Sequence, residues 1–152
     1  MCQQNCNLVY GGATIGLMGC IADEAKKFGA HVLGVVPKVI TTREIANEDI
    51  DELIITEDMH ERKKILYKRS DILVILPGGF GTLDEAFESI TWNQLDIHKI
   101  PVVFINWFGY FDGIKDWIKN AKKEKFIKVY DNFEPKFVEN NEEFFNWLKE
   151  NE

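Results

Sequence analysis

Two short runs of the sequence are apolar at every position, and they limit the fold more than any other feature. Residues 72–76 read Ile-Leu-Val-Ile-Leu, and residues 102–105 read Val-Val-Phe-Ile. A strand with one face in water alternates apolar and polar residues, whereas a strand that is apolar throughout is buried on both faces. Burial on both faces is typical of a parallel sheet between two layers of helices, so these runs predict an α/β fold.

Helical patterns alternate with strand patterns along the rest of the chain, as they do in parallel α/β proteins. The patterns predict strands at residues 7–10, 31–36, 52–56, 72–76 and 102–105, and helices at residues 15–28, 58–70, 82–95, 110–123 and 142–150. There is no internal repeat or linker, and 152 residues suit one domain. We therefore predict a single Rossmann-like nucleotide-binding domain over residues 1–152, with helices on both faces of its sheet.

Charge and composition exclude several classes of protein. The net charge is −7 and no basic stripe is present, which argues against nucleic acid as a partner. No apolar run approaches the roughly 20 residues that span a bilayer, and the first seven residues do not resemble a signal peptide. The three cysteines and three histidines lack the spacing of metal ligands. The chain is expected to be a cytoplasmic protein without a metal.

A glycine-rich turn follows the first apolar run and opens a predicted helix. Residues 77–82 read Pro-Gly-Gly-Phe-Gly-Thr. Because glycine lacks a Cβ, the backbone can approach a ligand closely, and the N–H groups at the start of the next helix favour an anion. Ligands of open α/β sheets bind beyond the carboxyl ends of strands, where this turn lies. The turn predicts a phosphate cradle, and a merely tight strand–helix turn is the alternative.

A second glycine-rich turn spans residues 11–19, between a predicted strand and a predicted helix. Its glycines would let the backbone approach a ligand, or would let the helix pack closely on the sheet. These two interpretations are equally supported by the sequence.

Two cations occupy the apolar stripe of the helix predicted at residues 58–70. Met59 and Leu66 mark the centre of the stripe, and at about 100° per residue Arg62 and Lys63 fall beside them. Their long stems can carry the charges to the surface. The alternative is an anionic partner, either a substrate phosphate or a carboxylate.

Two stretches fit the capping-box pattern, Asp58 with Glu61 and Thr82 with Glu85. For Glu85, that structural role competes with a catalytic one. A carboxylate beside a bound phosphate needs cations nearby, which Arg62 and Lys63 could supply. Glu85 also lies opposite the apolar side of its helix, where a ligand can reach it.

Several aromatic residues lie close together in the sequence between positions 107 and 117. They could form an aromatic ligand box, but core packing or a subunit interface is the interpretation that the pattern favours. The residues are Trp107, Phe108, Tyr110, Phe111 and Trp117.

Together these residues resemble the Lonely Guy (LOG) family of cytokinin riboside 5′-monophosphate phosphoribohydrolases, which often carry the label lysine decarboxylase. The likeness runs from about Leu8 to the C-terminus. Its most specific part is the stretch at residues 77–85, Pro-Gly-Gly-Phe-Gly-Thr-Leu-Asp-Glu, paired with Met-His-Glu-Arg-Lys at residues 59–63. Residues 8–12, 16–19, 43–45 and 90–92 also match.

The resemblance implies a homodimer or higher homo-oligomer that hydrolyses the N-glycosidic bond of a cytokinin or other purine riboside 5′-monophosphate. The products would be the free base and ribose 5-phosphate, and no cofactor would take part. Arg62 and Glu85 would be catalytic. The implied nucleotide-binding residues are Glu44, Arg62, Lys63, Gly78, Gly79, Phe80, Gly81, Thr82, Leu83, Asp84, Glu85 and Thr91.

Three other functions are alternatives to this one. Lysine decarboxylation needs pyridoxal phosphate on a Schiff-base lysine, and Lys63, the one lysine in the motifs, lacks the necessary neighbours. A non-enzymatic nucleotide or molybdenum-cofactor carrier would need a phosphate cradle but no paired arginine and glutamate. A nucleosidase acting more broadly on nucleoside 5′-monophosphates would differ only in its base pocket.

The N-terminal part departs from the family pattern. Family members usually begin with a further strand and helix, whereas only seven residues precede Leu8 here. We therefore expect either an N-terminally truncated domain whose sheet lacks that strand, or a sheet that is rearranged or completed by another subunit. In a Rossmann order the lacking strand would lie between the strands predicted at residues 7–10 and 72–76.

Overall fold

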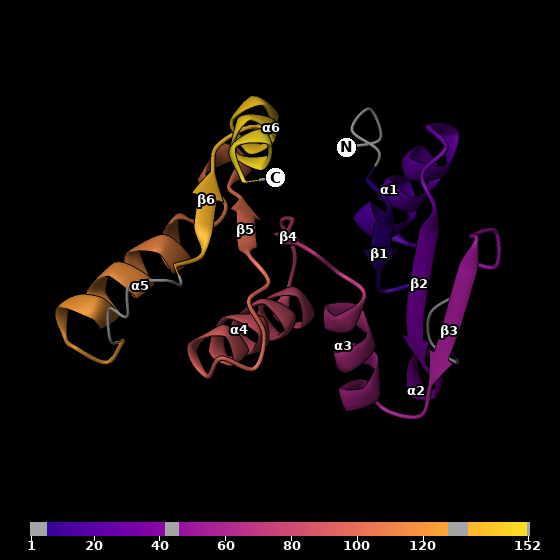
Figure 1. Ribbon diagram of the computed structural model, residues 1–152, viewed down its shortest axis with the longest axis horizontal. Coiled ribbons are helices and arrows are strands. Elements are labelled where there is room, and N and C mark those ends of the chain that lie inside the picture. The colour runs from indigo at the N-terminus through magenta and orange to yellow at the C-terminus, as the bar shows by residue number, and fades with distance from the viewer. Residues whose placement is uncertain (1–5, 42–45, 128–133, 152) are drawn as a thin grey trace. The chain divides into compact units, whose positions relative to one another are not determined.

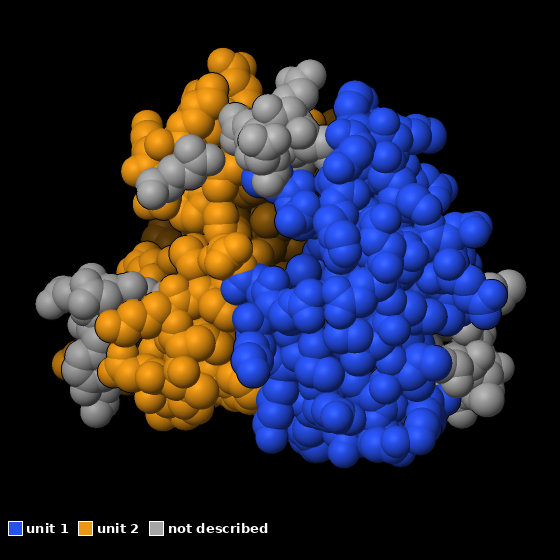
Figure 2. Space-filling view, turned by 45° about the vertical axis from the view of Figure 1, so that its right-hand side comes forward, with its two compact units in different colours: residues 1–70 blue, residues 71–152 orange. Residues whose placement is uncertain are grey.

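The computed structural model describes residues 6–41, 46–127 and 134–151. The chain divides into two compact units, residues 1–70 and residues 71–152 (Figures 1 and 2). Each unit contains a three-stranded sheet with helices packed on it.

The sheet of the first unit is parallel, in the order β1-β2-β3. Val32, in the middle strand, packs towards α1 with Ala22, whereas the next residue, Leu33, packs towards α3 with Leu66. This alternation follows from the period of two in a strand, and it places one helix on each face. The elements of this unit are β1 (Leu8–Tyr10), α1 (Gly16–Lys27), β2 (Val32–Pro37), α2 (Lys38–Thr41), β3 (Glu52–Thr56) and α3 (Met59–Lys68).

The sheet of the second unit is also parallel, in the order β4-β5-β6. Its elements are β4 (Leu73–Ile75), α4 (Phe80–Gln94), β5 (Val102–Ile105), a 3-10 turn η2 (Trp107–Gly109), α5 (Asp112–Lys123), β6 (Lys136–Val138) and α6 (Asn141–Glu150). In Figure 1 the colours of this unit run from magenta-red at β4 through orange to yellow at α6.

The wholly apolar strand β5 is buried on both faces, as its sequence predicts. Phe104 packs with Ala86 of α4 and with Phe111 at the start of α5. Val103 points the other way and packs with Phe144 of α6. Burial of side chains of this size stabilises a fold by roughly 1.5–3 kcal/mol each, so β5 is the central support of the unit.

The predicted α/β class, with parallel strands and helices on both faces, is confirmed, but the strands form two sheets rather than one. β1 is an edge strand of the first sheet and β4 is an edge strand of the second. Within the described ranges, no strand pairs with the outer edge of either. These are the two strands between which the Rossmann order predicts a further strand.

His98, in the connection between α4 and β5, is held in a partly buried polar contact. Its Nδ1 lies 3.0 Å from Asn93 Oδ1, and Asn93 Nδ2 donates to the carbonyl of Ile100 at 2.8 Å. Burial lowers the pKa of His98 below its usual value of 6.5, because the charged form loses solvation. The folded chain therefore favours neutral His98.

Acidification is expected to destabilise the fold through His98. The stabilisation is complete above the usual histidine pKa of 6.5, and it is lost as the pH falls through the lower pKa of the folded state. Urea unfolding at a series of pH values should show a smaller loss of stability for His98→Gln than for the wild type. The exposed His31 offers a matched control, since His31→Gln should follow the wild type. Identical pH profiles for His98→Gln and wild type would contradict this role.

Candidate functional site

The glycine-rich turn leads from β4 directly into α4. The helix begins at Phe80, and Gly79 precedes it in an extended conformation, with φ −95° and ψ −151°. No side chain caps this end of the helix, and its first turn carries no acidic residue. The first four N–H groups of a helix have no partner within the helix, and the helix dipole adds positive potential there. The start of α4 is therefore suited to bind an anion.

The three glycines of this turn differ in what a side chain would meet at each position. A Cβ on Gly79 or Gly81 would meet no atom within 4 Å, and neither residue has a positive φ. Glycine at these two positions leaves space beside the helix start that a bound group can enter. A Cβ on Gly78, in contrast, would lie 2.2 Å from Thr82 Oγ1, so packing alone requires glycine there. This geometry supports a cradle rather than a merely tight turn.

Of the two predicted capping boxes, the first forms in part. Asp58 caps α3, and its side chain accepts from the N–H groups of His60 and Glu61, both at 2.8 Å. Glu61 Oε2 accepts from the N–H of Glu57 at 2.8 Å, one residue before the expected partner.

The second capping box is wrong, because α4 starts two residues before Thr82. Thr82 is the third residue of the helix and Glu85 the sixth, so neither occupies the position that the predicted capping box requires. The Thr82–Glu85 capping box therefore does not form, and the catalytic role of Glu85 stays a prediction.

The other residues predicted to bind the nucleotide along α4 have varied surroundings. Phe80 and Asp84 are exposed, whereas Leu83 packs against the core of the unit. The hydroxyl of Thr91 donates to the carbonyl of Phe87, one turn earlier, at 2.7 Å. Glu44 lies outside the described residues.

In the first unit, Arg62 lies inside the fold, as the helical pattern predicts. Only 8% of Arg62 and 7% of its neighbour Lys63 is exposed. Arg62 Nε donates to the carbonyl of Val35 at 3.0 Å. Val35 is one residue beyond the last pair between β1 and β2, which joins Tyr10 to Gly34. The guanidinium is therefore held at the carboxyl end of β1, where open sheets bind ligands.

Two glycines of the second turn serve packing within this unit. Gly12 has a φ of +78°, and a Cβ there would lie 2.3 Å from Val36 Cγ2. A Cβ on Gly19 would lie 2.1 Å from the carbonyl oxygen of Thr14. Gly11 differs from both, because its Cβ would lie 2.7 Å from Arg62 Nη2. Gly11 thus makes room for the guanidinium.

Replacing Gly11 with alanine is expected to displace the Arg62 guanidinium while the chain still folds. The added methyl group also meets Met18 Sδ at 3.3 Å, so both neighbours are flexible side chains. Misplacement of a reacting group by about 1 Å costs up to roughly 10²-fold in rate, and we expect at least a tenfold lower kcat/KM for the activity proposed below.

The matched control for Gly11→Ala is Gly113→Ala in α5, where a Cβ would meet no atom within 4 Å. Alanine favours a helix over glycine by about 1 kcal/mol, so this variant should keep full activity and equal or greater stability. Full activity of Gly11→Ala would show that Arg62 needs no room at this position.

One contact of the glycine turn is missed by the sequence interpretation. The pattern assigns the aromatic residues between positions 107 and 117 to the core or an interface. Phe111 is in the core, at 1% exposed, but Tyr110 is 56% exposed. The Tyr110 hydroxyl donates to the carbonyl of Gly78 at 2.9 Å. Tyrosine often packs its apolar ring while its hydroxyl makes a hydrogen bond. No sequence spacing predicts such a contact between residues 32 positions apart.

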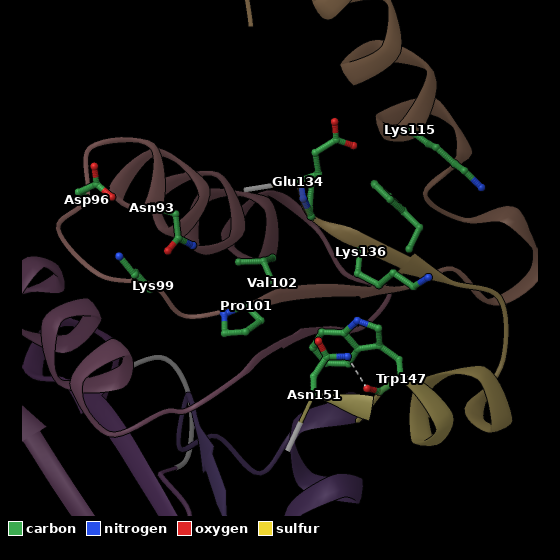
Figure 3. Close-up of a pocket in the computed structure, with 12 residues that line it drawn as sticks. Asn93, Asp96, Lys99, Pro101, Val102, Lys115, Glu134, Lys136, Trp147 and Asn151 are labelled. Carbon is green, nitrogen blue, oxygen red and sulfur yellow. Dashed lines mark hydrogen bonds between the residues drawn. The ribbon is translucent and has the colours of Figure 1, made fainter. Parts of the chain in front are cut away.

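A pocket of about 780 Å³ lies elsewhere in the second unit. Figure 3 shows Pro101 and Val102, at the start of β5, beside Trp147 of α6. Lys136, at the start of β6, also lines it. The pocket is therefore at the amino ends of the strands, opposite to the glycine turn, and it contains none of the predicted site residues.

Two features are absent from residues 6–41, 46–127 and 134–151. These ranges contain no group of three or more histidine, cysteine, aspartate or glutamate residues that could hold a metal. They also contain no helix with the length and hydrophobicity of a membrane span.

Comparison with known proteins identifies a family and several relatives. The model of a family described as possible lysine decarboxylase matches residues 18–148. Cytokinin riboside 5′-monophosphate phosphoribohydrolase LOG1 of Arabidopsis thaliana is 46% identical over 125 residues, which cover 82% of this chain and 59% of the relative. A probable enzyme of the same description from Oryza sativa subsp. japonica, LOGL2, is 43% identical and is covered over 51% of its length. The chain thus spans between one half and three fifths of these relatives.

A solved structure has a similar fold. The molybdenum cofactor binding protein from the phototrophic bacterium Rippkaea orientalis superposes with a TM-score of 0.67, over 98% of this chain and 79% of that protein. The two sequences are 21% identical, so the likeness establishes the fold alone.

Proposed function

This chain belongs to the LOG family, which is described as possible lysine decarboxylases, and from this premise we propose that it hydrolyses the N-glycosidic bond of a nucleoside 5′-monophosphate. The reaction releases the free base and ribose 5-phosphate. A cytokinin or other purine riboside 5′-monophosphate is the substrate that the relatives' names support.

The observation that carries the proposal is the start of α4. Gly79 and Gly81 leave open space beside N–H groups that no side chain caps. We assign this place to the 5′-phosphate. The phosphate is remote from the bond that breaks, so its binding energy serves to position the ribose for reaction. This division of roles predicts that nucleosides without the phosphate react far more slowly.

Glu85 is the proposed catalytic carboxylate. Breaking the bond between C1′ and the base nitrogen builds oxocarbenium character on the ribose, and a nearby carboxylate stabilises that charge and orients water. Glu85 lies within α4, after the helix start that we assign to the phosphate. A carboxylate there repels the phosphate unless cations offset the repulsion.

Arg62 and Lys63 are the proposed cations. Both are nearly buried, and the Arg62 guanidinium is oriented by Val35 and by the room at Gly11. A buried guanidinium with fixed geometry suits bidentate binding of an anion. In the proposed reaction, Arg62 fixes the substrate and Lys63 adds to the positive potential.

A homodimer is part of the proposal. The second unit exposes several large apolar side chains, and a subunit interface would remove such side chains from water. These residues are Phe80, Leu95, Ile97, Phe108, Trp117 and Phe126. Light scattering after gel filtration should give twice the chain mass, and a monomer over the whole concentration range would exclude this part of the proposal.

The test of the function is a panel of nucleotides analysed for free base by chromatography. The panel should contain the 5′-monophosphates of adenosine, isopentenyladenosine, guanosine and the pyrimidine nucleosides, with the unphosphorylated nucleosides as controls. The proposal requires base release from at least one monophosphate and much less from its nucleoside. Binding of nucleotides without release of any base would instead indicate a carrier.

A further inference from the structure

A single long-range hydrogen bond joins the glycine turn to the connection between β5 and α5. The Tyr110 hydroxyl donates to the carbonyl of Gly78 at 2.9 Å, across 32 residues of sequence. We propose that Tyr110 is a positioning residue that orients the peptide between Gly78 and Gly79, so that the Gly79 N–H faces a bound phosphate. The inference rests on the proposed function, because it assigns a role within the same anion site.

The argument begins with the geometry of the peptide unit. The described chain contains no cis peptide bond, and in a planar trans peptide the C=O and the following N–H point in opposite directions. When the carbonyl of Gly78 is held by Tyr110, the N–H of Gly79 is therefore directed away from Tyr110. Gly79 is the residue immediately before α4, where the side of its Cα is open. The hydrogen bond thus fixes a donor at the mouth of the helix.

Such a constraint is needed because the turn is rich in glycine. A peptide between two glycines can rotate with little steric cost, since no Cβ restricts φ or ψ. Rotation of this peptide by half a turn would replace the N–H with a carbonyl oxygen, which repels an anion. Thr82 restricts the movement of Gly78 on one side, because the Thr82 side chain lies against the Cα of Gly78. Tyr110 holds the carbonyl itself, which Thr82 does not.

The hydroxyl of Tyr110 is itself held in place by an unusual turn. Phe108 and Gly109 have φ values of +56° and +72°, in the left-handed region. A bulky residue such as Phe108 rarely adopts this conformation unless its surroundings impose it. The N–H of Gly109 donates to the carbonyl of Asn106 at 3.1 Å, and the N–H of Tyr110 donates to that of Trp107 at 3.1 Å.

Asn106 anchors this turn from within the core. Its side chain is fully buried, and Oδ1 accepts from the N–H of Phe111 at 2.6 Å. Nδ2 donates to Asp112 at 2.8 Å and to Glu139 at 2.9 Å. The Tyr110 ring packs edge-on against buried Phe111, with 5.0 Å between the centroids. The fold therefore fixes the orientation of the ring, and this orientation places the exposed hydroxyl within hydrogen-bonding distance of the Gly78 carbonyl.

The test is Tyr110→Phe, which removes the hydroxyl and keeps the ring. A neutral hydrogen bond of this kind changes an equilibrium by roughly 2–10-fold. We expect the Kd for ribose 5-phosphate and for AMP to rise by that factor, with an equal rise in KM and a kcat within about twofold of wild type. Binding of adenosine, which has no phosphate, should not change. A loss confined to phosphate-bearing ligands is not expected from a purely structural role.

Ser70→Ala is the matched control, because the Ser70 hydroxyl also donates to a main-chain carbonyl, that of Leu66, at 2.8 Å. This variant should bind ribose 5-phosphate as tightly as the wild type. An unchanged Kd and KM in Tyr110→Phe would overturn the inference. A second measurement uses only the wild type, in which inorganic phosphate should shift the Gly79 amide resonance strongly. An unmoved Gly79 resonance would also overturn it.

These outcomes separate the positioning role from the proposed reaction. If the wild type binds ribose 5-phosphate and Tyr110→Phe binds it more weakly, the inference stands even when no nucleotide yields free base. If the wild type hydrolyses a nucleotide and Tyr110→Phe retains the same Kd and KM, the inference fails and the proposed function stands.

Discussion

Glu85→Gln is expected to lower kcat for base release by roughly 10²–10⁴-fold while nucleotide binding is retained. Glutamine has the shape of glutamate but carries no charge, so it cannot stabilise an oxocarbenium-like ribose or activate water. Binding of AMP should be unchanged or tighter, because a negative charge near the phosphate is removed. Quenched-flow or steady-state assays of free base, together with calorimetric titration of AMP, measure the two effects separately.

Glu88→Gln is the control for this variant. It removes the same charge from the same helix, one turn further along, at a residue without an assigned role. We expect its kcat to stay close to the wild-type value. If Glu85→Gln retains full turnover, the carboxylate assignment is refuted, whichever base the enzyme prefers.

Arg62→Ala is expected to have the second largest effect, a fall in kcat/KM of roughly 10²–10³-fold, comparable to the loss of one donor that stabilises a transition state. The guanidinium is nearly buried and donates to the carbonyl of Val35, so the fold fixes its position. Arg62→Lys should recover only a small part of the activity, since an ammonium group cannot bind in the planar, bidentate manner of a guanidinium.

Lys68→Ala serves as the control on the same helix, since Lys68 is exposed near the end of α3. This substitution removes one positive charge without touching the buried face, and activity should be unchanged. Circular dichroism and urea unfolding should show that Arg62→Ala remains folded. A folded Arg62→Ala variant with wild-type kcat/KM would remove Arg62 from the mechanism.

The buried strands and most helices were predictable from the sequence, because their patterns reflect local physics. β5 was predicted with the observed bounds, since four consecutive apolar residues have one plausible use in an α/β protein. The inward position of Arg62 followed from helical periodicity alone. The three-residue strand β6 was missed, because Lys136 exposes a charge and no alternation can be read over so short a stretch.

Features that depend on distant parts of the chain were not predictable in this way. The start of α4 was placed at Thr82, because the sequence offers a threonine where a cap is expected. The helix instead begins at Phe80, with Gly79 at the N-cap position. The capping box predicted for Thr82 and Glu85 therefore does not form. The contact of Tyr110 with Gly78 depends on how the connection after β5 folds over the end of β4, which no local pattern encodes.

The outer edges of β1 and β4 bear on how the protein behaves at high concentration. Unpaired main-chain donors and acceptors on an edge can recruit a strand from another molecule and so seed aggregation. Each of these two strands is only three residues long. A foreign strand would gain few hydrogen bonds on either, so brevity itself protects the protein against uncontrolled polymerisation.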